Sequence, residues 1–251
     1  MDCEKAFTSI VLQTRIFFKN ANSSKAVLGL SGGIDSALVA KILAKAIGAE
    51  NVFAISMPLN EKISKQDISH AKNWAKALKI NFYLLPISEF AKPFEKLKWK
   101  QSKISKGNSF ARLRMNILYN FANSQNAIVA GTGNRTELSL GYFTKYGDGG
   151  ADVLPIGSIY KTKVIEMAKF LKLPKEIIEK KPTAGLWQGQ TDEKEIGMKY
   201  CEMDSILKAL IDEKKPVEIV KKEFGSKNVE IILKRIENAK HKLCLAKILE
   251  I

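Results

Sequence analysis

Along the first half of the chain, short apolar runs alternate with longer segments in which apolar residues recur at helical spacing. Unbroken apolar runs are typical of strands that are buried on both faces of a sheet. They predict strands at residues 25–30, 52–57, 82–85 and 127–130. The periodic segments between them predict helices at residues 36–47, 64–78 and 110–123. Because parallel strands need crossover connections, this alternation predicts a parallel sheet.

The predicted fold class is therefore α/β, a doubly wound parallel sheet with helices on both faces and a helical C-terminal part. The second half of the chain predicts helices alone, at residues 160–171, 203–211, 216–224 and 229–242. Residues 6–18 predict an amphipathic helix, whose apolar face must pack on the rest of the chain or on a partner subunit. Ser64 and Asp67 have the spacing of a capping box at the start of the 64–78 helix.

Three Gly-rich or Lys-rich stretches separate these elements, at residues 98–108, 144–151 and 183–191. Long loops inside a compact domain are usually functional lids or disordered segments. No Pro/Gly/Ser-rich linker and no internal repeat divides the sequence. We therefore expect residues 1–251 to form a single domain.

The amino-acid composition and net charge limit the kinds of molecule that the protein is expected to bind. The 251 residues are 45% hydrophobic, and 41 Lys and Arg against 26 Asp and Glu give a net charge of +15. Such a balance favours phosphate-rich partners, which include nucleotides, nucleic acids and anionic membranes. Three cysteines and two histidines exclude a disulfide framework and a multi-histidine metal centre. No run approaches the roughly 20 apolar residues of a membrane span, so we expect a soluble, cytoplasmic protein without a membrane partner.

The sharpest local pattern is the segment Ser-Gly-Gly-Ile-Asp-Ser at residues 31–36, between a predicted strand and a predicted helix. A turn without bulky side chains lets backbone amides approach phosphate oxygens, and the helix N-terminus adds partial positive charge. Asp35 would be repelled by a phosphate unless a cation bridges them, so we interpret it as a Mg²⁺ ligand. The hydroxyls of Ser31 and Ser36 would then contact phosphate. An ordinary tight turn, in which Asp35 and Ser36 cap the helix, is the alternative.

This segment resembles the pyrophosphate loop of the N-type ATP pyrophosphatases, which split ATP between its α- and β-phosphates. The resemblance implies an adenine nucleotide alpha-hydrolase-like fold. Residues 131–152 are similar to the signature block of the NAD synthetases within that group. Residues 108–115 and 182–200, and the pair His241-Lys242, resemble further segments of the same family in the same order.

The resemblance implies a reaction: ATP, deamido-NAD and ammonia give NAD, AMP and pyrophosphate through an acyl-adenylate, as the last step of NAD biosynthesis. It also implies that Glu137 joins Asp35 in holding Mg²⁺. The residues implied to bind ATP, Lys161 contacting its phosphates, are Gly29, Leu30, Ser31, Gly32, Gly33, Ile34, Asp35, Ser36, Thr132, Lys161 and Thr183. Without the resemblance, Glu137 and Lys161 would be read as exposed helical residues and the threonines as backbone caps.

Deamido-NAD is expected to contact Arg112, Lys145, Asp152, His241 and Lys242. The catalytic candidates are Lys161 and Asp152. The sequence leaves open whether Asp152 orients the reacting end of the substrate or accepts a proton from incoming ammonium. Lys and His are also common at helix C-termini, and the chain lacks the proline-containing tail that often follows the pair in this family, so an ordinary helix end is the alternative for His241 and Lys242.

The nitrogen source and the assembly follow from the same resemblance. Glutamine-using members carry an additional glutaminase domain, normally before the synthetase part, and the first predicted strand starts by Lys25. We therefore expect free ammonia as the nitrogen donor. We also expect a homodimer, with the 6–18 and 110–123 helices as contact surfaces.

Two other functions compete with this interpretation. A tRNA-modifying ATP pyrophosphatase of the same fold would explain the net charge through phosphate neutralisation. A non-catalytic basic protein that binds nucleotides or nucleic acid is the second. The 131–152 block opposes the first, and the candidate metal ligands Asp35 and Glu137 oppose the second. We therefore expect no nucleic-acid partner.

Overall fold

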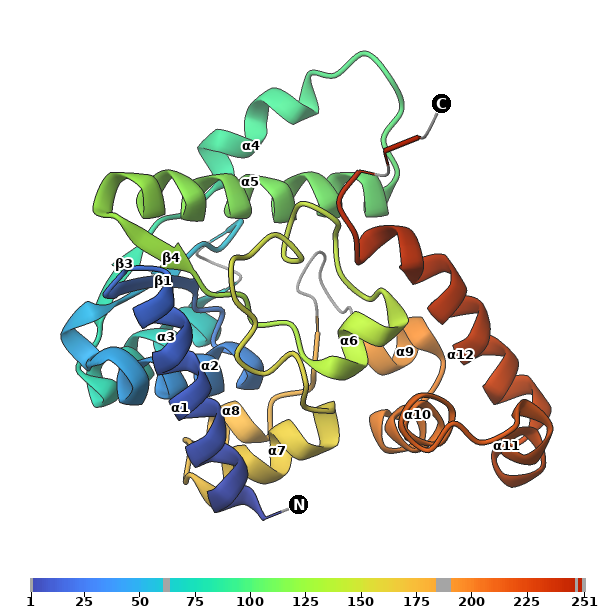
Figure 1. The fold of residues 1–251 in the computed structure, drawn as a ribbon. Helices are drawn as coiled ribbons and strands as arrows, with labels where there is room; N and C mark the ends of the chain where they lie inside the picture. Colours follow the sequence, from blue (N-terminus) through green and yellow to red (C-terminus); the bar gives the residue numbers. More distant parts are fainter. Residues whose placement is uncertain (1, 61–63, 184–190, 247, 250–251) are drawn as a thin grey trace.

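The protein is built around a four-stranded parallel sheet with helices on both of its faces (Figure 1). The computed structural model describes residues 2–60, 64–183, 191–246 and 248–249. The strands are β1 (Lys25–Gly29), β2 (Val52–Ser56), β3 (Asn81–Leu84) and β4 (Ala127–Val129). All four predicted strands and the predicted fold class are confirmed.

The strand order is β3-β2-β1-β4, so the chain moves outward on one side of β1 and then returns to its other side. Val27 in β1 lies between Phe53 of β2 and Val129 of β4. Ligands of doubly wound sheets bind outside the carboxyl ends of the strands, where the order reverses. In this chain that point lies between β1 and β4, next to the segments that follow Gly29 and Val129.

One face of the sheet is covered by α2 (Ile34–Ile47) and α3 (Lys65–Leu78), and α7 (Lys161–Phe170) and α8 (Lys175–Ile178) pack on α2 in the same apolar cluster. α1 (Cys3–Asn20) packs outside them against α2 and α7 and buries Phe18. Arg15 of α1 donates to the carbonyl oxygens of Lys45 and Ala46 at the end of α2. The predicted N-terminal helix therefore packs on its own chain.

The opposite face is covered by α5 (Lys103–Gln125), which packs on Val27, Ile55 and Val129, and α4 (Ser88–Glu95) packs on α5. α5 begins at Lys103, where the apolar pattern placed the start of this helix at residue 110. The expected loop at 98–108 is therefore wrong in its second half. The reason is a local cap: the Ser102 hydroxyl accepts a hydrogen bond from the Ser105 amide at 3.0 Å.

A third apolar cluster belongs to the C-terminal helices and to α6 (Arg135–Leu140). Its helices are α9 (Asp192–Ile196), α10 (Tyr200–Leu207), α11 (Val217–Phe224) and α12 (Ser226–Ala239). α10 continues into a π-helical turn at Lys208–Asp212, and α12 into a 3₁₀ turn at Lys240–Lys242. Figure 1 shows α10, α11 and α12 apart from the sheet, beside α6. The predicted helical C-terminal part is confirmed.

The predicted capping box at Ser64 is wrong. Ser64 precedes α3, but its backbone lies at φ −96° and ψ 15°, and its side chain makes no capping bond to a described residue. Asp67 instead pairs with Lys180 at 2.6 Å. A capping box does occur at α6, where Asn134 and Glu137 each accept from the other's backbone amide.

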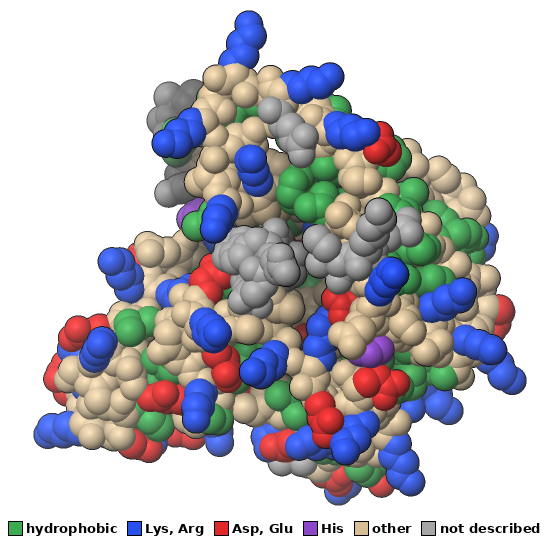
Figure 2. Space-filling view, turned by 180° about the vertical axis from the view of Figure 1, so that it is seen from behind, with side chains coloured by type: hydrophobic (Ala, Val, Ile, Leu, Met, Phe, Trp, Pro, Cys, Tyr) green, Lys and Arg blue, Asp and Glu red, His purple; other side chains and the backbone are tan. Residues whose placement is uncertain are grey.

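On one face of the molecule the positive charge is dispersed. Figure 2 shows Lys and Arg side chains scattered over the face seen there, with Asp and Glu side chains among them. Cys3, Cys201 and Cys244 are free thiols. Over the described residues, no helix has the length and apolar content that crossing a membrane requires.

Candidate functional site

The loop after β1 is shaped for a close backbone approach. Gly32 adopts φ +75°, and a Cβ at this position would lie 2.5 Å from the carbonyl oxygen of Asp67. Only glycine satisfies both the left-handed conformation and the contact with α3. The loop leads into the first turn of α2, whose leading amides have no acceptor within the helix. This arrangement can receive a phosphate group.

The two serines of this loop bond to each other. Ser31 Oγ and Ser36 Oγ lie 3.1 Å apart, and Ser36 Oγ donates to the carbonyl oxygen of Gly33 at 3.0 Å. Ser36 is buried, so its hydroxyl maintains the shape of the loop in this structure. Contact of either hydroxyl with phosphate stays a prediction.

Asp35 and Asn134 connect the two segments that meet at the reversal of strand order. Asp35 lies in the first turn of α2, and Asn134 caps α6 after β4. Asn134 Nδ2 donates to Asp35 Oδ1 at 3.0 Å. Asn134 is fully buried, so this bond fixes the direction of the carboxylate. The sequence analysis did not assign Asn134 a role, although it lies inside the 131–152 block.

Lys161 is the central cation of the site. It is the first residue of α7, its side chain is only 2% exposed, and its ammonium pairs with Asp35 Oδ2. Glu137 Oε1 lies 3.9 Å from the same nitrogen. The ring of Tyr200 faces the ammonium, 5.3 Å from centroid to nitrogen. Three predicted residues, Asp35, Glu137 and Lys161, are thus brought together.

The charges of this cluster are out of balance, because two carboxylates share one ammonium. Burial and, after it, the nearby carboxylate of Asp35 raise the pKa of Glu137 to about 8, against the opposing effect of Lys161. Burial would lower the pKa of Lys161, but the carboxylates of Asp35 and Glu137 outweigh it and raise that pKa. The cluster therefore attracts an additional positive charge, either a proton or a metal ion.

The donor set fits Mg²⁺ if phosphate and water complete it. Within the described residues, no group of three or more His, Cys, Asp or Glu side chains gathers to hold a metal. Asp35 and Glu137 offer two carboxylates, and Mg²⁺ commonly binds through one or two carboxylates together with substrate phosphates.

A second group of predicted residues meets around the 141–150 segment. Arg112 Nε on α5 donates to the carbonyl oxygen of Lys145 at 3.2 Å, and the Lys145 ammonium donates to the carbonyl oxygen of His241. Lys242 Nζ donates to the carbonyl oxygens of Gly141 and Phe143, at 2.7 and 2.9 Å. The four predicted deamido-NAD contacts Arg112, Lys145, His241 and Lys242 thus lie on one connected stretch of structure.

Asp152 lies apart from that group. Its Oδ1 accepts from the Tyr119 hydroxyl at 2.9 Å, and its Oδ2 accepts from the Val129 amide at 2.8 Å. Burial and this bond raise the pKa of Tyr119 to about 12. The carboxylate therefore ties the segment after the 141–150 stretch to β4 and α5, a structural role that the sequence analysis did not consider.

The structure gives fewer contacts for the other residues that were predicted to bind ATP. Thr132 lies in the segment between β4 and α6, and Thr183 is exposed at the end of a described stretch. Most of the predicted loop at 183–191 lies outside the described residues. The other predicted residues, Gly29, Leu30, Gly33 and Ile34, surround Gly32 at the end of β1 and the start of α2.

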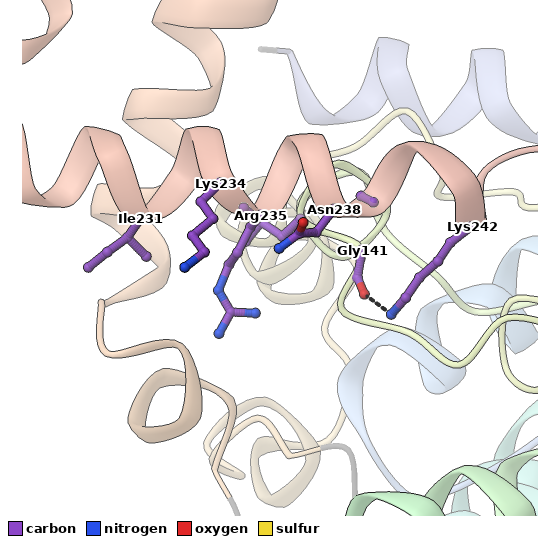
Figure 3. A pocket seen from close by; sticks show the side chains of 8 residues that line it. Gly141, Ile231, Lys234, Arg235, Asn238 and Lys242 are labelled. Carbon is purple, nitrogen blue, oxygen red and sulfur yellow. Dashed lines mark hydrogen bonds between the residues drawn. The ribbon is translucent and has the colours of Figure 1, made fainter.

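A cavity of about 340 Å³ opens between the end of α6 and one side of α12. Figure 3 shows Lys234, Arg235 and Asn238 along this side of α12, with Lys242 bonded to Gly141 at its end. Burial lowers the pKa of Lys242, and the charge of Arg235 lowers it further. The cavity thus has a basic wall that ends at a predicted substrate contact.

The chain is similar to known proteins over most of its length. Residues 7–246 match the family described as NAD synthase. The NH(3)-dependent NAD(+) synthetase of Archaeoglobus fulgidus is 47% identical over 210 residues, which are 84% of this chain and 85% of that protein. The solved structure of an NMN synthetase from Francisella tularensis superposes with a TM-score of 0.87 at 36% identity, covering 100% of both chains. The NH3-dependent NAD synthetase of Campylobacter jejuni gives a TM-score of 0.84 at 32% identity, also over 100% of both chains.

Proposed function

Because the chain belongs to the NAD synthase family, we infer that it catalyses the ATP-dependent amidation of deamido-NAD with ammonia. It is a ligase that forms a C–N bond, and ATP is its co-substrate. The observation that carries the inference is the meeting of Asp35, Glu137 and Lys161 where the strand order reverses. There the site can hold a nucleotide triphosphate beside a second anionic substrate.

We propose that the reaction passes through an acyl-adenylate. The carboxylate of deamido-NAD attacks the α-phosphorus, and pyrophosphate leaves. The loop around Gly32 and the first turn of α2 bind the phosphates through backbone amides. Lys161, buried and charged, stabilises the negative charge that grows on the phosphoryl oxygens during the attack. Ammonia then attacks the acyl carbon, and AMP leaves.

We propose that Asp35 and Glu137 hold Mg²⁺ together with ATP. The ion would neutralise phosphate charge so that the substrate carboxylate can approach. The proposal is supported by the excess carboxylate charge of the cluster and by the Asn134 bond that orients Asp35. When ATP binds, Lys161 can move its ammonium from Asp35 toward phosphate, which frees an oxygen for the metal.

Deamido-NAD is proposed to contact Arg112, Lys145, His241 and Lys242. Their connection through backbone carbonyls supports a common binding surface. Arginine and lysine there suit the phosphates of a dinucleotide. The two possible roles of Asp152 on substrate stay predictions, because its oxygens are bonded to Tyr119 and Val129 in this structure.

We further propose a single domain over residues 1–251 and a homodimer. The dimer is supported by Leu12 and Ile16, apolar side chains exposed on α1, which is one of the two predicted contact surfaces. Exposed apolar side chains outside the predicted surfaces, at the free edge of the sheet and on α4, are Tyr83, Leu84 and Phe90. Light scattering on the purified protein should give twice the monomer mass, and an active monomer would refute the assembly. The cytoplasmic location and the lack of a nucleic-acid partner stay predictions.

The tRNA-modifying and non-catalytic alternatives are not favoured by the family match. One neighbouring structure is described as an NMN synthetase, so the size of the substrate deserves a direct test. The assay should therefore offer deamido-NAD and, separately, the carboxylate form of the mononucleotide.

The proposed function is tested by following AMP and NAD formation from ATP and deamido-NAD. With an ammonium salt, the two products should appear in equal amounts. With glutamine alone, neither should accumulate. Turnover driven by glutamine would refute ammonia as the donor, and faster conversion of the mononucleotide would reassign the substrate.

A further inference from the structure

A buried carboxylate outside the described cluster connects the C-terminal helices to the site. Asp204 lies on α10 and is 6% exposed. Its Oδ1 accepts from the hydroxyl of Thr136 on α6 at 2.5 Å. Its Oδ2 accepts from the amide of Thr162, in the first turn of α7, at 2.8 Å. Each oxygen thus reaches a different element of the site.

Thr136 extends this connection. Its hydroxyl donates to Asp204 and accepts from the backbone amide of Lys161 at 2.9 Å. Thr136 is fully buried, so water does not replace these bonds. Asp204 and Thr136 together therefore fix the first two residues of α7 to the first turn of α6.

The residues that bond to Asp204 are direct sequence neighbours of two residues of the site. Thr136 directly precedes Glu137, and Thr162 directly follows Lys161. Glu137 and Lys161 carry the side chains that meet at Asp35. A carboxylate that served only to cap α7 would need one bond to its leading amides. The second bond, to α6, sets the spacing between the two elements.

We propose that Asp204 is a positioning residue, which holds α6 and α7 so that Glu137 and Lys161 face Asp35 during ATP activation. It touches no substrate. The proposal rests on the proposed function, because it assigns Glu137 and Lys161 to the ATP side of the reaction. Groups that orient the residues of a metal or phosphate site typically change activity by about 10–100-fold when they are replaced.

The first test compares Asp204→Asn with the wild type. The amide offers one acceptor where the carboxylate offers two, so one of the two bonds is lost. We expect kcat to fall about 10–100-fold and the Mg²⁺ concentration for half-maximal activity to rise. KM for deamido-NAD should change less than twofold, because its proposed contacts lie on α5, in the 141–150 segment and in the 3₁₀ turn that follows α12. An unchanged kcat, with the KM for ATP and the KM for deamido-NAD changed by the same factor, would overturn the proposal.

A matched pair at Thr136 keeps the test informative if Asp204→Asn fails to fold. Thr136→Ser retains the hydroxyl and should keep the wild-type kcat and Mg²⁺ response. Thr136→Val retains the shape and loses both bonds, so it should reproduce the kcat loss of Asp204→Asn. If Thr136→Val were as active as Thr136→Ser, the connection would not position the site.

The variant Val229→Ala distinguishes a loss of positioning from a general loss of stability. Val229 lies on α12, is fully buried in the C-terminal cluster, and is not one of the residues that bond to Asp204 or Thr136. It should lower the melting temperature without changing the Mg²⁺ response. If Val229→Ala shifted that response as Thr136→Val does, Asp204 would be a packing residue only. If the wild type formed no NAD, the proposed function would be refuted. If the wild type were active and the Asp204 and Thr136 variants behaved like it, only the positioning role of Asp204 would be refuted.

Discussion

Asn134 Nδ2 donates to Asp35 Oδ1 at 3.0 Å, across 99 positions of sequence. The bond joins the segment after β4 to the first turn of α2, on either side of the reversal in strand order. It leaves Asp35 Oδ2 to Lys161. The direction of the carboxylate is therefore fixed before any nucleotide binds.

Replacing Asp35 tests the metal assignment. Asp35→Asn keeps the size of the side chain but removes the charge that faces Lys161 and the proposed Mg²⁺. We expect kcat for NAD formation to fall about 100-fold or more, because charge stabilisation in such sites is worth several kcal/mol. The circular dichroism spectrum should be unchanged. A variant with near wild-type turnover at saturating Mg²⁺ would contradict the assignment.

Replacing Lys161 tests the central cation. Lys161→Met removes the ammonium partner of Asp35 and Glu137, whose side chains are 17% and 19% exposed, and we expect the free energy of unfolding at pH 8 to drop by about 3 kcal/mol. Activity should be lost as well. The control is Lys163→Met on the same helix, which removes an exposed pair with Glu166 and should cost about 0.5 kcal/mol or less. Urea denaturation of both variants measures the difference, and equal effects would refute the central role.

The pH dependence of stability tests the raised pKa of Glu137. Its pKa is about 8 in the folded protein against an ordinary value of 4.5. The folded state therefore binds this proton more tightly than the unfolded state does. The proton on Glu137 thus raises the free energy of unfolding by its full amount below pH 4.5, and this contribution is lost as pH rises through 8.

Glu137→Gln removes this dependence. In the absence of Mg²⁺, the variant should be more stable than the wild type at pH 9, by about 4–5 kcal/mol for a pKa raised from 4.5 to about 8, and equal to it within about 0.5 kcal/mol at pH 4.5. Its NAD formation should be strongly reduced. Urea denaturation at the two pH values with EDTA measures the effect. A stability difference that does not change with pH would show that the Glu137 pKa is ordinary.

The loop after β1 is tested by a pair of glycine substitutions. Gly32 and Gly197 have similar positive φ angles, +75° and +83°, but only Gly32 has a backbone oxygen 2.5 Å from an added Cβ. Gly197→Ala should cost about 1–2 kcal/mol for the backbone conformation alone. Gly32→Ala should cost more and should weaken ATP binding at least about tenfold, because the loop must shift away from α3. Calorimetric titration with ATP measures both variants, and similar affinities would contradict the shaped loop.

The sequence predicted the sheet because its signals are local. An apolar run followed by Gly32 and Gly33 marks a buried strand and its turn wherever it occurs. The start of α5 was missed, because its first turns carry lysines and serines without an apolar stripe. Its first turn is stabilised by the Ser102 cap, and Gly107 is buried one turn further along.

The site was only partly predictable, because sequence signals are local and several of its contacts join distant segments. Asp35, Glu137 and Lys161 were found through motifs that resemble a known family. Asp204 lies 68 positions from Thr136, and nothing around it in the sequence distinguishes it from any polar helical residue. Hydrogen bonds between distant helices leave no periodic pattern, so the spacing of α6 and α7 became visible only in the folded chain.

The apolar cluster of the C-terminal helices is separate from the two clusters on the faces of the sheet. The cluster of Asp35, Glu137 and Lys161 draws Asp35 from the sheet side and Glu137 from the helical side. Gentle heating that loosens α10–α12 while the strands stay intact would thus silence the enzyme early. In a temperature ramp, NAD production should decline several degrees before the far-ultraviolet signal of the whole protein begins to change.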